Sequence, residues 1–374
     1  MPEIIKVATP MCGDEEIEAV AEVLLSGNYV SGVKVKQFED EWASYVGTEH
    51  AVAVDSGTDA IRLTLQALCI GPGDEVIVPA LTFFATASAV LMVGATPIFA
   101  DIDPDTYNMN PWHVVELVEN HKPTAIIPVH YFGHPVNVSH FTDIGEDYET
   151  IIIGDAAQAH GAEYKGKKVG SFFEAEAWSF YATKNLTCAI EAGMVTTDNE
   201  DLAEVLRILR NHGMTDGNTH SLLGGNNRMS EIGAVVGLVQ LQYLDRYNQV
   251  RDENSLYLRE RLEDVSWLKV PPVKDYATRH AWFWCPIEVD ELKLGMTTLQ
   301  LRKRLYDAGV ETRYRYHAPL YKQPVLEQYR RLHDYSKDWC PVAERVCGKL
   351  LGLPNHPKLD QDSLDRIIEV VKSI

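Results

Sequence analysis

Short apolar runs alternate with amphipathic helical segments through the first 200 residues of the chain. The runs are AVAV (51–54), EVIVPA (75–80), TPIFADID (96–103), TAIIPVH (124–130), TIIIGDA (150–156), AEAWSFYA (175–182) and AGMVTT (192–197). Strands of this kind separated by helices predict βαβ units and a mostly parallel sheet with helices on both faces.

A long helical stretch and a change of pattern follow this region. From about residue 230 the chain reads as one helix, beginning SEIGAVVGLVQLQ. Beyond it lie a strand-like segment, WFWCPIEV (282–289), a helix near 297–308 and an α+β tail. We expect two domains, a large one over residues 1–245 and a small one over residues 246–374, with the boundary inside the long helix.

The charge balance limits the class of partner. The chain has 34 Lys and Arg against 54 Asp and Glu, a formal net charge of −20. Nucleic-acid affinity comes largely from Lys and Arg that neutralise phosphates, so a nucleic-acid binder is not expected, nor is a protein held on anionic lipid. With no signal sequence, no 20-residue apolar span and six scattered cysteines, we expect a cytoplasmic protein with free thiols and no metal site.

Polar residues follow the apolar runs at four places. Ligands of open parallel sheets bind at the carboxyl ends of the strands, so these places are candidate site segments. They are Ser56-Gly57-Thr58, Asp155 to Gln158, Ser179 to Lys184, and Asn226 to Arg228.

Three of these segments carry distinct chemistry. Ser56-Gly57-Thr58 opens a helix and could cradle a phosphate on free N–H groups, although a simple N-cap would look the same. Asp155 ends a buried run and needs a partner such as a protonated heterocyclic nitrogen, or it caps the next helix. Lys184, among apolar and small residues, could have a lowered pKa and act as an amine nucleophile, or it could be an ordinary surface charge.

The combination points to one cofactor. Pyridoxal phosphate needs a phosphate cradle, an acid at the pyridine nitrogen, an aromatic face and a lysine that forms the covalent link. The sequence offers these in order as Ser56-Gly57-Thr58, Phe83 or Phe84, Asp155 and Lys184.

At these residues the chain resembles the sugar aminotransferases of the DegT/DnrJ/EryC1/StrS type. The resemblance runs almost end to end and implies the aspartate aminotransferase (type I) fold. It is carried by segments 55–111, PVHYFGHPVN (128–137), GDAAQAHGAEYKGKKVGSF (154–172), SFYATKN (179–185) and NNRMSEIGAVVGLVQLQ (226–242).

The resemblance implies a role for each cofactor residue. Lys184 would form the covalent link to pyridoxal phosphate and move the proton, with pyridoxamine phosphate as the intermediate form. Asp155 would pair with the pyridinium nitrogen, Gln158 would lie near the 3-hydroxyl and Phe83 would stack on the ring. The phosphate would be held by Ser179, Gly57 and Thr58 beside Ser56.

Other family residues point to a partner subunit and to the substrate. Asn226 would reach the phosphate of the neighbouring subunit's cofactor, which implies a homodimer with shared active sites. Arg228 belongs to the same motif with a less defined role. His160 is typical of the family and would either contact substrate or pack in the interior.

One segment departs from the family pattern. After the lysine the family commonly has Gly-Asp/Glu-Gly-Gly, whereas this chain has Ile190-Glu191-Ala192-Gly193. Because glycine permits backbone conformations that Ile and Ala resist, we expect a turn of different shape near the substrate.

The resemblance implies an aminotransferase that moves an amino group from glutamate or glutamine to a nucleotide-linked keto-deoxysugar. PVHYFGHPVN and GAEYKGKKVGS are similar to perosamine-synthase-like enzymes acting on GDP- or dTDP-4-keto-6-deoxyhexoses, which favours that acceptor over a 3-keto sugar or a cyclitol. Selectivity is expected in loops 212–228 and 312–322. Candidates for holding a nucleotide diphosphate there are Arg313, Tyr314, Arg315, Tyr316, His317 and Tyr321.

Two other functions fit the same scaffold less well. A cofactor-dependent sugar dehydratase of this family has histidine at the lysine position, and this chain has Lys184. A non-catalytic regulator that binds cofactor or sugar as a signal would not need the complete cofactor set, and only the altered turn at 190–192 favours it.

Overall fold

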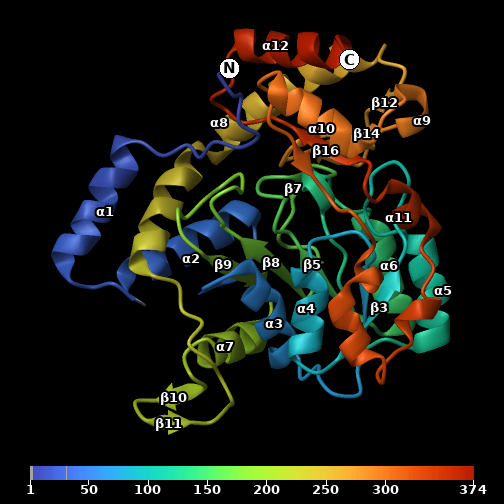
Figure 1. Ribbon diagram of the computed structural model, residues 1–374. Coiled ribbons are helices and arrows are strands. Elements are labelled where there is room, and N and C mark those ends of the chain that lie inside the picture. The colour runs from blue at the N-terminus through green and yellow to red at the C-terminus, as the bar shows by residue number, and fades with distance from the viewer. Residues whose placement is uncertain (1–2, 31) are drawn as a thin grey trace.

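A mixed seven-stranded sheet forms the centre of the computed structural model, which describes residues 3–30 and 32–374 (Figure 1). In order across the sheet its strands are β1 (His50–Val54), β9 (Gly193–Thr197), β8 (Ala175–Ser179), β5 (Ile151–Asp155), β4 (Ala125–Ile126), β2 (Glu75–Pro79) and β3 (Thr96–Ala100). The pairs from β8 to β3 are parallel, and β9 runs antiparallel to β1 and β8. The predicted mostly parallel sheet is confirmed.

Helices cover both faces of this sheet, as its mostly buried strands require. One face packs against α3 (Gly57–Ala67), α4 (Ala85–Met92) and α7 (Glu200–Leu209). The other packs against α2 (Val33–Val46), the first half of α8 (Glu231–Leu262), α5 (Pro111–His121) and α6 (Val138–Tyr148). Strand β1 shows how the sequence divides between the faces, because Val52 and Val54 enter the first core while Ala51 and Ala53 enter the second.

The C-terminal part of the chain builds a second, antiparallel sheet. Its strands in order are β12 (Leu268–Lys269), β14 (Cys285–Val289), β16 (Leu350–Leu353) and β15 (Arg313–Tyr314). It packs with α10 (Thr298–Asp307), α12 (Gln361–Lys372) and the end of α8 into a separate apolar cluster. Helix α8 joins the two cores, and the predicted boundary at residue 245 falls inside it.

The remaining elements are short or peripheral. They are α1 (Asp14–Ser26), α9 (Glu291–Leu294), α11 (Pro341–Val346), the 3₁₀ helices η1 (Tyr131–Gly133), η2 (Leu320–Lys322), η3 (Pro324–Tyr329) and η4 (Tyr335–Lys337), the three-stranded sheet of β6 (Glu163–Tyr164), β7 (Lys167–Lys168) and β13 (Ala277–Arg279), and the hairpin of β10 (Met214–Asp216) and β11 (Thr219–His220). The hairpin projects from the body at the bottom of Figure 1, and α1 lies along the side of α8.

Among the described residues, no helix combines the length and the apolarity needed to cross a membrane.

Candidate active site

A cavity of about 460 Å³ lies at the carboxyl edge of the central sheet. Its lining combines segments 56–61, 82–85, 155–158 and 179–191 with segments 283–284 and 313–316 of the C-terminal part. Three of the four segments singled out in the sequence therefore meet in one place. The fourth, Asn226 to Arg228, does not line this cavity.

Strand register brings the phosphate-cradle residues together. Gly193, the first residue of β9, pairs with Val54 at the end of β1 and with Ser179 at the end of β8. Because β9 is antiparallel, its start lies at the same edge as the ends of its neighbours. Ser56, two residues after Val54, caps α3 by accepting a hydrogen bond from the Asp59 N–H at 3.1 Å.

Two glycines of the phosphate cradle lie too close to neighbouring residues to carry a side chain. A Cβ on Gly57 would lie 2.6 Å from the Ser179 Cβ, and a Cβ on Gly193 would overlap the Ser56 carbonyl. The first N–H groups of α3 and the Ser179 hydroxyl therefore face one small space. N–H groups at a helix N-terminus and a hydroxyl are the donors that a phosphate requires.

Asp155 is held rigidly at the end of β5. Its Oδ2 accepts a hydrogen bond from the Thr86 hydroxyl at 2.9 Å, and its Oδ1 accepts one from the Ala157 N–H at 3.1 Å. Burial raises the pKa of this carboxyl, while the two hydrogen bonds and the charge of Lys184 act in the opposite direction. A positively charged ring nitrogen in the cavity would favour the ionised carboxylate that these donors already orient.

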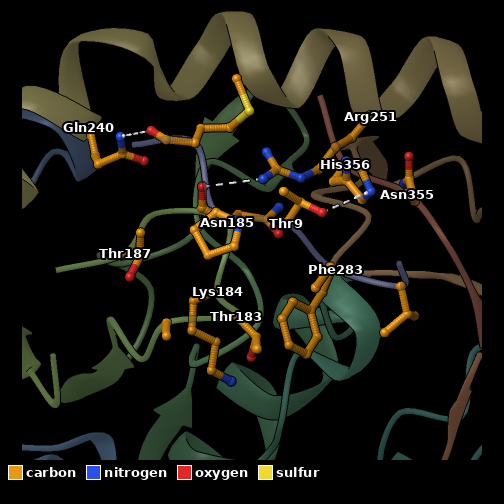
Figure 2. A pocket seen from close by; sticks show the side chains of 15 residues that line it. Thr9, Thr183, Lys184, Asn185, Thr187, Gln240, Arg251, Phe283, Asn355 and His356 are labelled. Carbon is orange, nitrogen blue, oxygen red and sulfur yellow. Dashed lines mark hydrogen bonds between the residues drawn. The ribbon is translucent and has the colours of Figure 1, made fainter. Parts of the chain in front are cut away.

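Lys184 projects into the same cavity from the segment after β8. Its Nζ lies 4.6 Å from the centre of the Phe283 ring, and Figure 2 shows its side chain extending away from Arg251 and Asn185. Burial lowers the pKa of Lys184 to about 8, an effect that Asp155 opposes and Arg315 reinforces. A lysine with this pKa has a substantial neutral fraction near neutral pH and can act as a nucleophile or a base.

Aromatic side chains and an amide complete the lining. Phe83 is 54% exposed at the mouth, and Phe283 and Trp284 enter from the C-terminal part. Gln158 accepts a hydrogen bond from the Phe132 N–H on Oε1 at 2.9 Å, so its NH₂ group is the end available to a ligand. These groups fit a planar ring that carries a phosphate, a basic nitrogen and a hydroxyl.

Three cationic or phenolic residues of the 313–316 segment reach the cavity. Arg313, Arg315 and Tyr316 line it, and both guanidinium groups lie over the Trp284 ring, at 5.5 Å and 5.6 Å. Burial and the neighbouring charge of Arg315 lower the pKa of Arg313. The segment therefore brings positive charge to the cavity, as the prediction of a diphosphate-binding loop requires.

Four candidate substrate residues lie outside the lining of this cavity: His160, Tyr314, His317 and Tyr321. His160 is fully buried among the rings of Trp42, Trp178 and Phe180, where burial lowers its pKa to about 3. It packs in the interior and does not line the cavity. The spacing of the motif does not predict this burial, because spacing does not specify which face of a turn is covered by other elements.

His317 and Tyr321 lie in or beside the segment that follows Tyr316. His317 is exposed and lies outside the cavity lining. Tyr321 is buried against Phe99, donates a hydrogen bond to Glu344 at 2.7 Å, and lines a different hollow. Both therefore lie outside this cavity of the single subunit, and a substrate contact by either stays a prediction.

Asn226 and Arg228 lie beside the cavity rather than in it. The Arg228 guanidinium donates to Asn226 Oδ1 at 3.0 Å and to Asn211 Oδ1 at 3.2 Å, and Asn226 is exposed. Their neighbour Asn227, which the motif did not single out, bonds Asp55 next to the phosphate cradle. A contact of Asn226 with a neighbouring subunit's cofactor stays a prediction.

The segment 190–193, which departs from the family pattern, keeps glycine at position 193, where the backbone approaches Ser56 closely. The positive φ of this segment, +63°, falls at Ala189, and the close approach to Ser56 falls at Gly193. Ile190 packs beside Gly233, and Glu191 lines the cavity. The acidic residue of the family pattern is therefore kept in the cavity lining as Glu191, and the departing Ile190 packs outside that lining.

Some residues of the site are not marked by any sequence motif. Thr86 orients Asp155 from α4, and the Phe283–Trp284 pair comes from a segment more than 90 residues after Lys184. The Phe283 N–H donates to the Phe132 carbonyl, which fixes that segment beside the central sheet. The WFW sequence of residues 282–284 predicts only a strand, so it does not identify Phe283 and Trp284 as part of the site.

A lysine, a carboxylate and a phosphate cradle at one edge of such a sheet define the class of type I pyridoxal-phosphate enzymes. Comparison with known proteins specifies the class further. The family model described as "DegT/DnrJ/EryC1/StrS aminotransferase family" matches residues 10–372. The chain belongs to this family of sugar aminotransferases, and it is an aminotransferase.

Individual relatives agree along nearly the whole chain. The spore coat polysaccharide biosynthesis protein SpsC of Bacillus subtilis is 37% identical over 380 residues, covering 98% of this chain and 95% of SpsC. DesV of S. venezuelae, solved in complex with a ketimine intermediate, superposes with a TM-score of 0.89 at 33% identity, covering 96% and 94%. DesI, solved in the presence of its TDP-sugar product, gives 0.88 at 29% identity, covering 100% and 93%.

The lowered pKa of Lys184 predicts the pH dependence of cofactor capture. The reactive amine is the neutral form, which predominates above a pKa of about 8, whereas an unperturbed lysine would need a pH above 10.5. Covalent capture of pyridoxal phosphate by the cofactor-free protein should therefore rise with pH and level off just above pH 8. The measurement is the initial rate of the visible absorbance change, divided by the rate for a free lysine derivative at each pH. A ratio that does not change with pH between 7 and 9 would contradict the assignment.

Proposed function

We propose that this protein transfers an amino group from glutamate or glutamine to a nucleotide-linked keto-deoxysugar, with a 4-keto-6-deoxyhexose favoured. The observation that carries the proposal is the meeting of Lys184, Asp155 and the phosphate cradle in one cavity that also contains Arg313 and Arg315. The TDP-sugar product named for DesI supports a nucleotide sugar as the acceptor class.

Each cofactor residue has one task in this proposal. Bound pyridoxal phosphate would supply a carbonyl that carries the amino group and a ring that withdraws electrons. The α3 N-terminus with Ser56, Gly57, Thr58 and Ser179 would hold its phosphate, and the Gln158 NH₂ group would meet the 3-hydroxyl.

Three further residues would act on the cofactor ring and on the transferred proton. The Asp155 carboxylate would hold a proton on the ring nitrogen, and Phe83 would cover one ring face. Lys184 Nζ would form the covalent link in the resting enzyme. In turnover it would move a proton from the α-carbon of the donor, and return one when the acceptor is aminated.

A homodimer completes the proposed site. Asn226 and Arg228 stand next to the cradle of their own subunit without lining its cavity, and the β10–β11 hairpin before them projects from the body (Figure 1). Large apolar side chains are exposed nearby, with Leu223 at 89% and Leu222 at 40%. Burying such side chains against a second copy is favourable, and it would bring Asn226 to the partner's cofactor.

The deciding experiment is a panel of acceptors offered to the cofactor-loaded enzyme with glutamate or glutamine. The panel varies the keto position (3 or 4) and the base (GDP, dTDP or UDP), and includes a keto cyclitol. We expect the highest kcat/KM with a 4-keto-6-deoxy sugar nucleotide. Turnover of a 3-keto sugar alone would move the assignment to a 3-aminotransferase. Turnover of the cyclitol alone would exclude a nucleotide sugar.

A further inference from the structure

Arg313 and Arg315 are two cations without a matching anion. In the part of the chain that the structure describes, arginine ion pairs are formed by Arg62, Arg210, Arg261, Arg279, Arg330 and Arg345. Arg313 and Arg315 form none, and the Nε atom of each is buried without a hydrogen-bond partner. Paired burial of like charges is unfavourable unless a ligand supplies negative charge.

The two guanidinium groups are not equivalent. Both lie over Trp284, but the Arg315 group also lies 5.9 Å from the Phe83 ring and 5.2 Å from the Tyr316 ring. The charge of Arg315 contributes to the lowered pKa of Lys184. Burial and then the charge of Arg315 lower the pKa of Arg313, and Glu311, Tyr181 and Arg302 have smaller effects. Arg315 is therefore the inner arginine, meaning the one that lies over Phe83, the residue expected to stack on the cofactor ring.

The charged groups around Arg315 leave it available to a ligand. Lys184 and Arg313 repel it, and Asp155 is already engaged by Thr86 and the Ala157 N–H. Glu191 lines the same cavity but makes no ion pair with either arginine among the described residues. No carboxylate of the described residues forms an ion pair with Arg315, so its guanidinium group is available to a substrate carboxylate.

Two substrate anions could enter the cavity, and their covalent geometry separates them. In an α-amino acid the carboxylate is attached to the same carbon as the reacting amine, so the cation that holds it must be next to the lysine. In a nucleotide sugar the diphosphate is separated from the keto carbon by the sugar ring, so its cation must be farther out. The inner position suits a carboxylate, and the guanidinium fork binds carboxylates through two parallel hydrogen bonds.

We propose that Arg315 binds the α-carboxylate of the amino donor. This inference rests on the proposed function, and it divides the arginine pair between the two substrates. Arg315 serves the donor, and Arg313 serves the acceptor diphosphate. Arg315 then determines specificity for a carboxylate-bearing donor over a simple amine.

The test measures the two half-reactions separately in the cofactor-loaded enzyme. The donor half-reaction is conversion of the pyridoxal form to the pyridoxamine form by L-glutamate, followed by absorbance in single turnover. The acceptor half-reaction is the return to the pyridoxal form with the best keto sugar from the panel. The variants are Arg315→Met, which keeps an apolar stem against Trp284, Arg315→Lys, which keeps the charge, and Arg313→Met as the matched variant over the same indole.

We expect Arg315→Met to lower kcat/KM for glutamate about 10- to 100-fold, the loss of a charge-assisted bidentate contact. Its acceptor half-reaction should change less than about threefold by the same reasoning. Arg315→Lys should recover part of the loss, and Arg313→Met should impair the acceptor half-reaction more than the donor half-reaction. Calorimetric binding of 2-oxoglutarate to the pyridoxal form, in which no amino transfer occurs, should weaken in Arg315→Met in parallel with the glutamate loss.

Several results would overturn the inference. They are an unchanged donor half-reaction in a folded Arg315→Met protein, an equal loss in both half-reactions, and a loss confined to the acceptor. Failure of the proposed function looks different, because the wild-type enzyme itself would then aminate no acceptor in the panel. In that case 2-oxoglutarate binding still decides the role of Arg315, since it requires only the carboxylate site.

Discussion

A Lys184→Arg protein should lose amino transfer by at least about 10⁴-fold, the upper range for loss of a general acid–base group. It should also lose the visible absorbance of covalently bound cofactor. Lys184 is the amine that lines the cavity opposite Asp155, and its lowered pKa suits it to both covalent attachment and proton movement. Arginine keeps the positive charge but cannot give up its proton near neutral pH. The measurements are steady-state turnover and the absorbance spectrum of the loaded protein.

Two further variants separate chemistry from folding. Lys36→Arg changes an exposed lysine on α2 that pairs with Asp40, and it should leave turnover unaltered. Lys184→Ala opens space beside Phe283, so a small primary amine added in solution should restore part of the proton transfer. Wild-type rates in Lys184→Arg would remove the lysine from the mechanism.

The location of the site could be predicted because it depends on strand ends. Asp155 and Ser179 are the last residues of β5 and β8, and Ser56 follows β1. Parallel strands deliver their carboxyl ends to one edge, so a pattern local in sequence becomes a cluster in space. The antiparallel strand β9 adds Gly193 to the same edge, and the sequence did not reveal its direction.

Contacts that depend on packing between distant segments could not be predicted. Thr86 reaches Asp155 across 69 positions of the chain, and no local pattern marks a threonine of an apolar helix as a carboxylate partner. The surroundings of His160 and Tyr321 also depend on distant segments. Both are polar side chains in segments that resemble the family. His160 packs among aromatic rings, and Tyr321 donates a hydrogen bond to Glu344 outside the cavity.

Asp155→Asn is the second substitution from which we expect a large effect. Asparagine keeps the size of the side chain and can still accept from Thr86, but it carries no charge to hold a proton on the cofactor's ring nitrogen. The ring would then withdraw electrons poorly when the donor loses its α-proton. We expect turnover to fall about 10³-fold, comparable to the loss of one pre-organised electrostatic group. Cofactor should remain covalently bound through Lys184, so the absorbance of the resting enzyme should persist.

The ring nitrogen itself gives a readout independent of turnover. With ¹⁵N-labelled cofactor, the nitrogen chemical shift should report a protonated ring in the wild-type protein and an unprotonated ring in Asp155→Asn. Thr86→Val should give a smaller change in the same direction, because the hydroxyl favours the ionised carboxylate and lowers the pKa of Asp155. Asp143→Asn, at an exposed position of α6, is the matched control and should alter neither the shift nor the rate. A protonated ring in Asp155→Asn would mean that another group holds the proton, and the carboxylate's place in the mechanism would have to be given up.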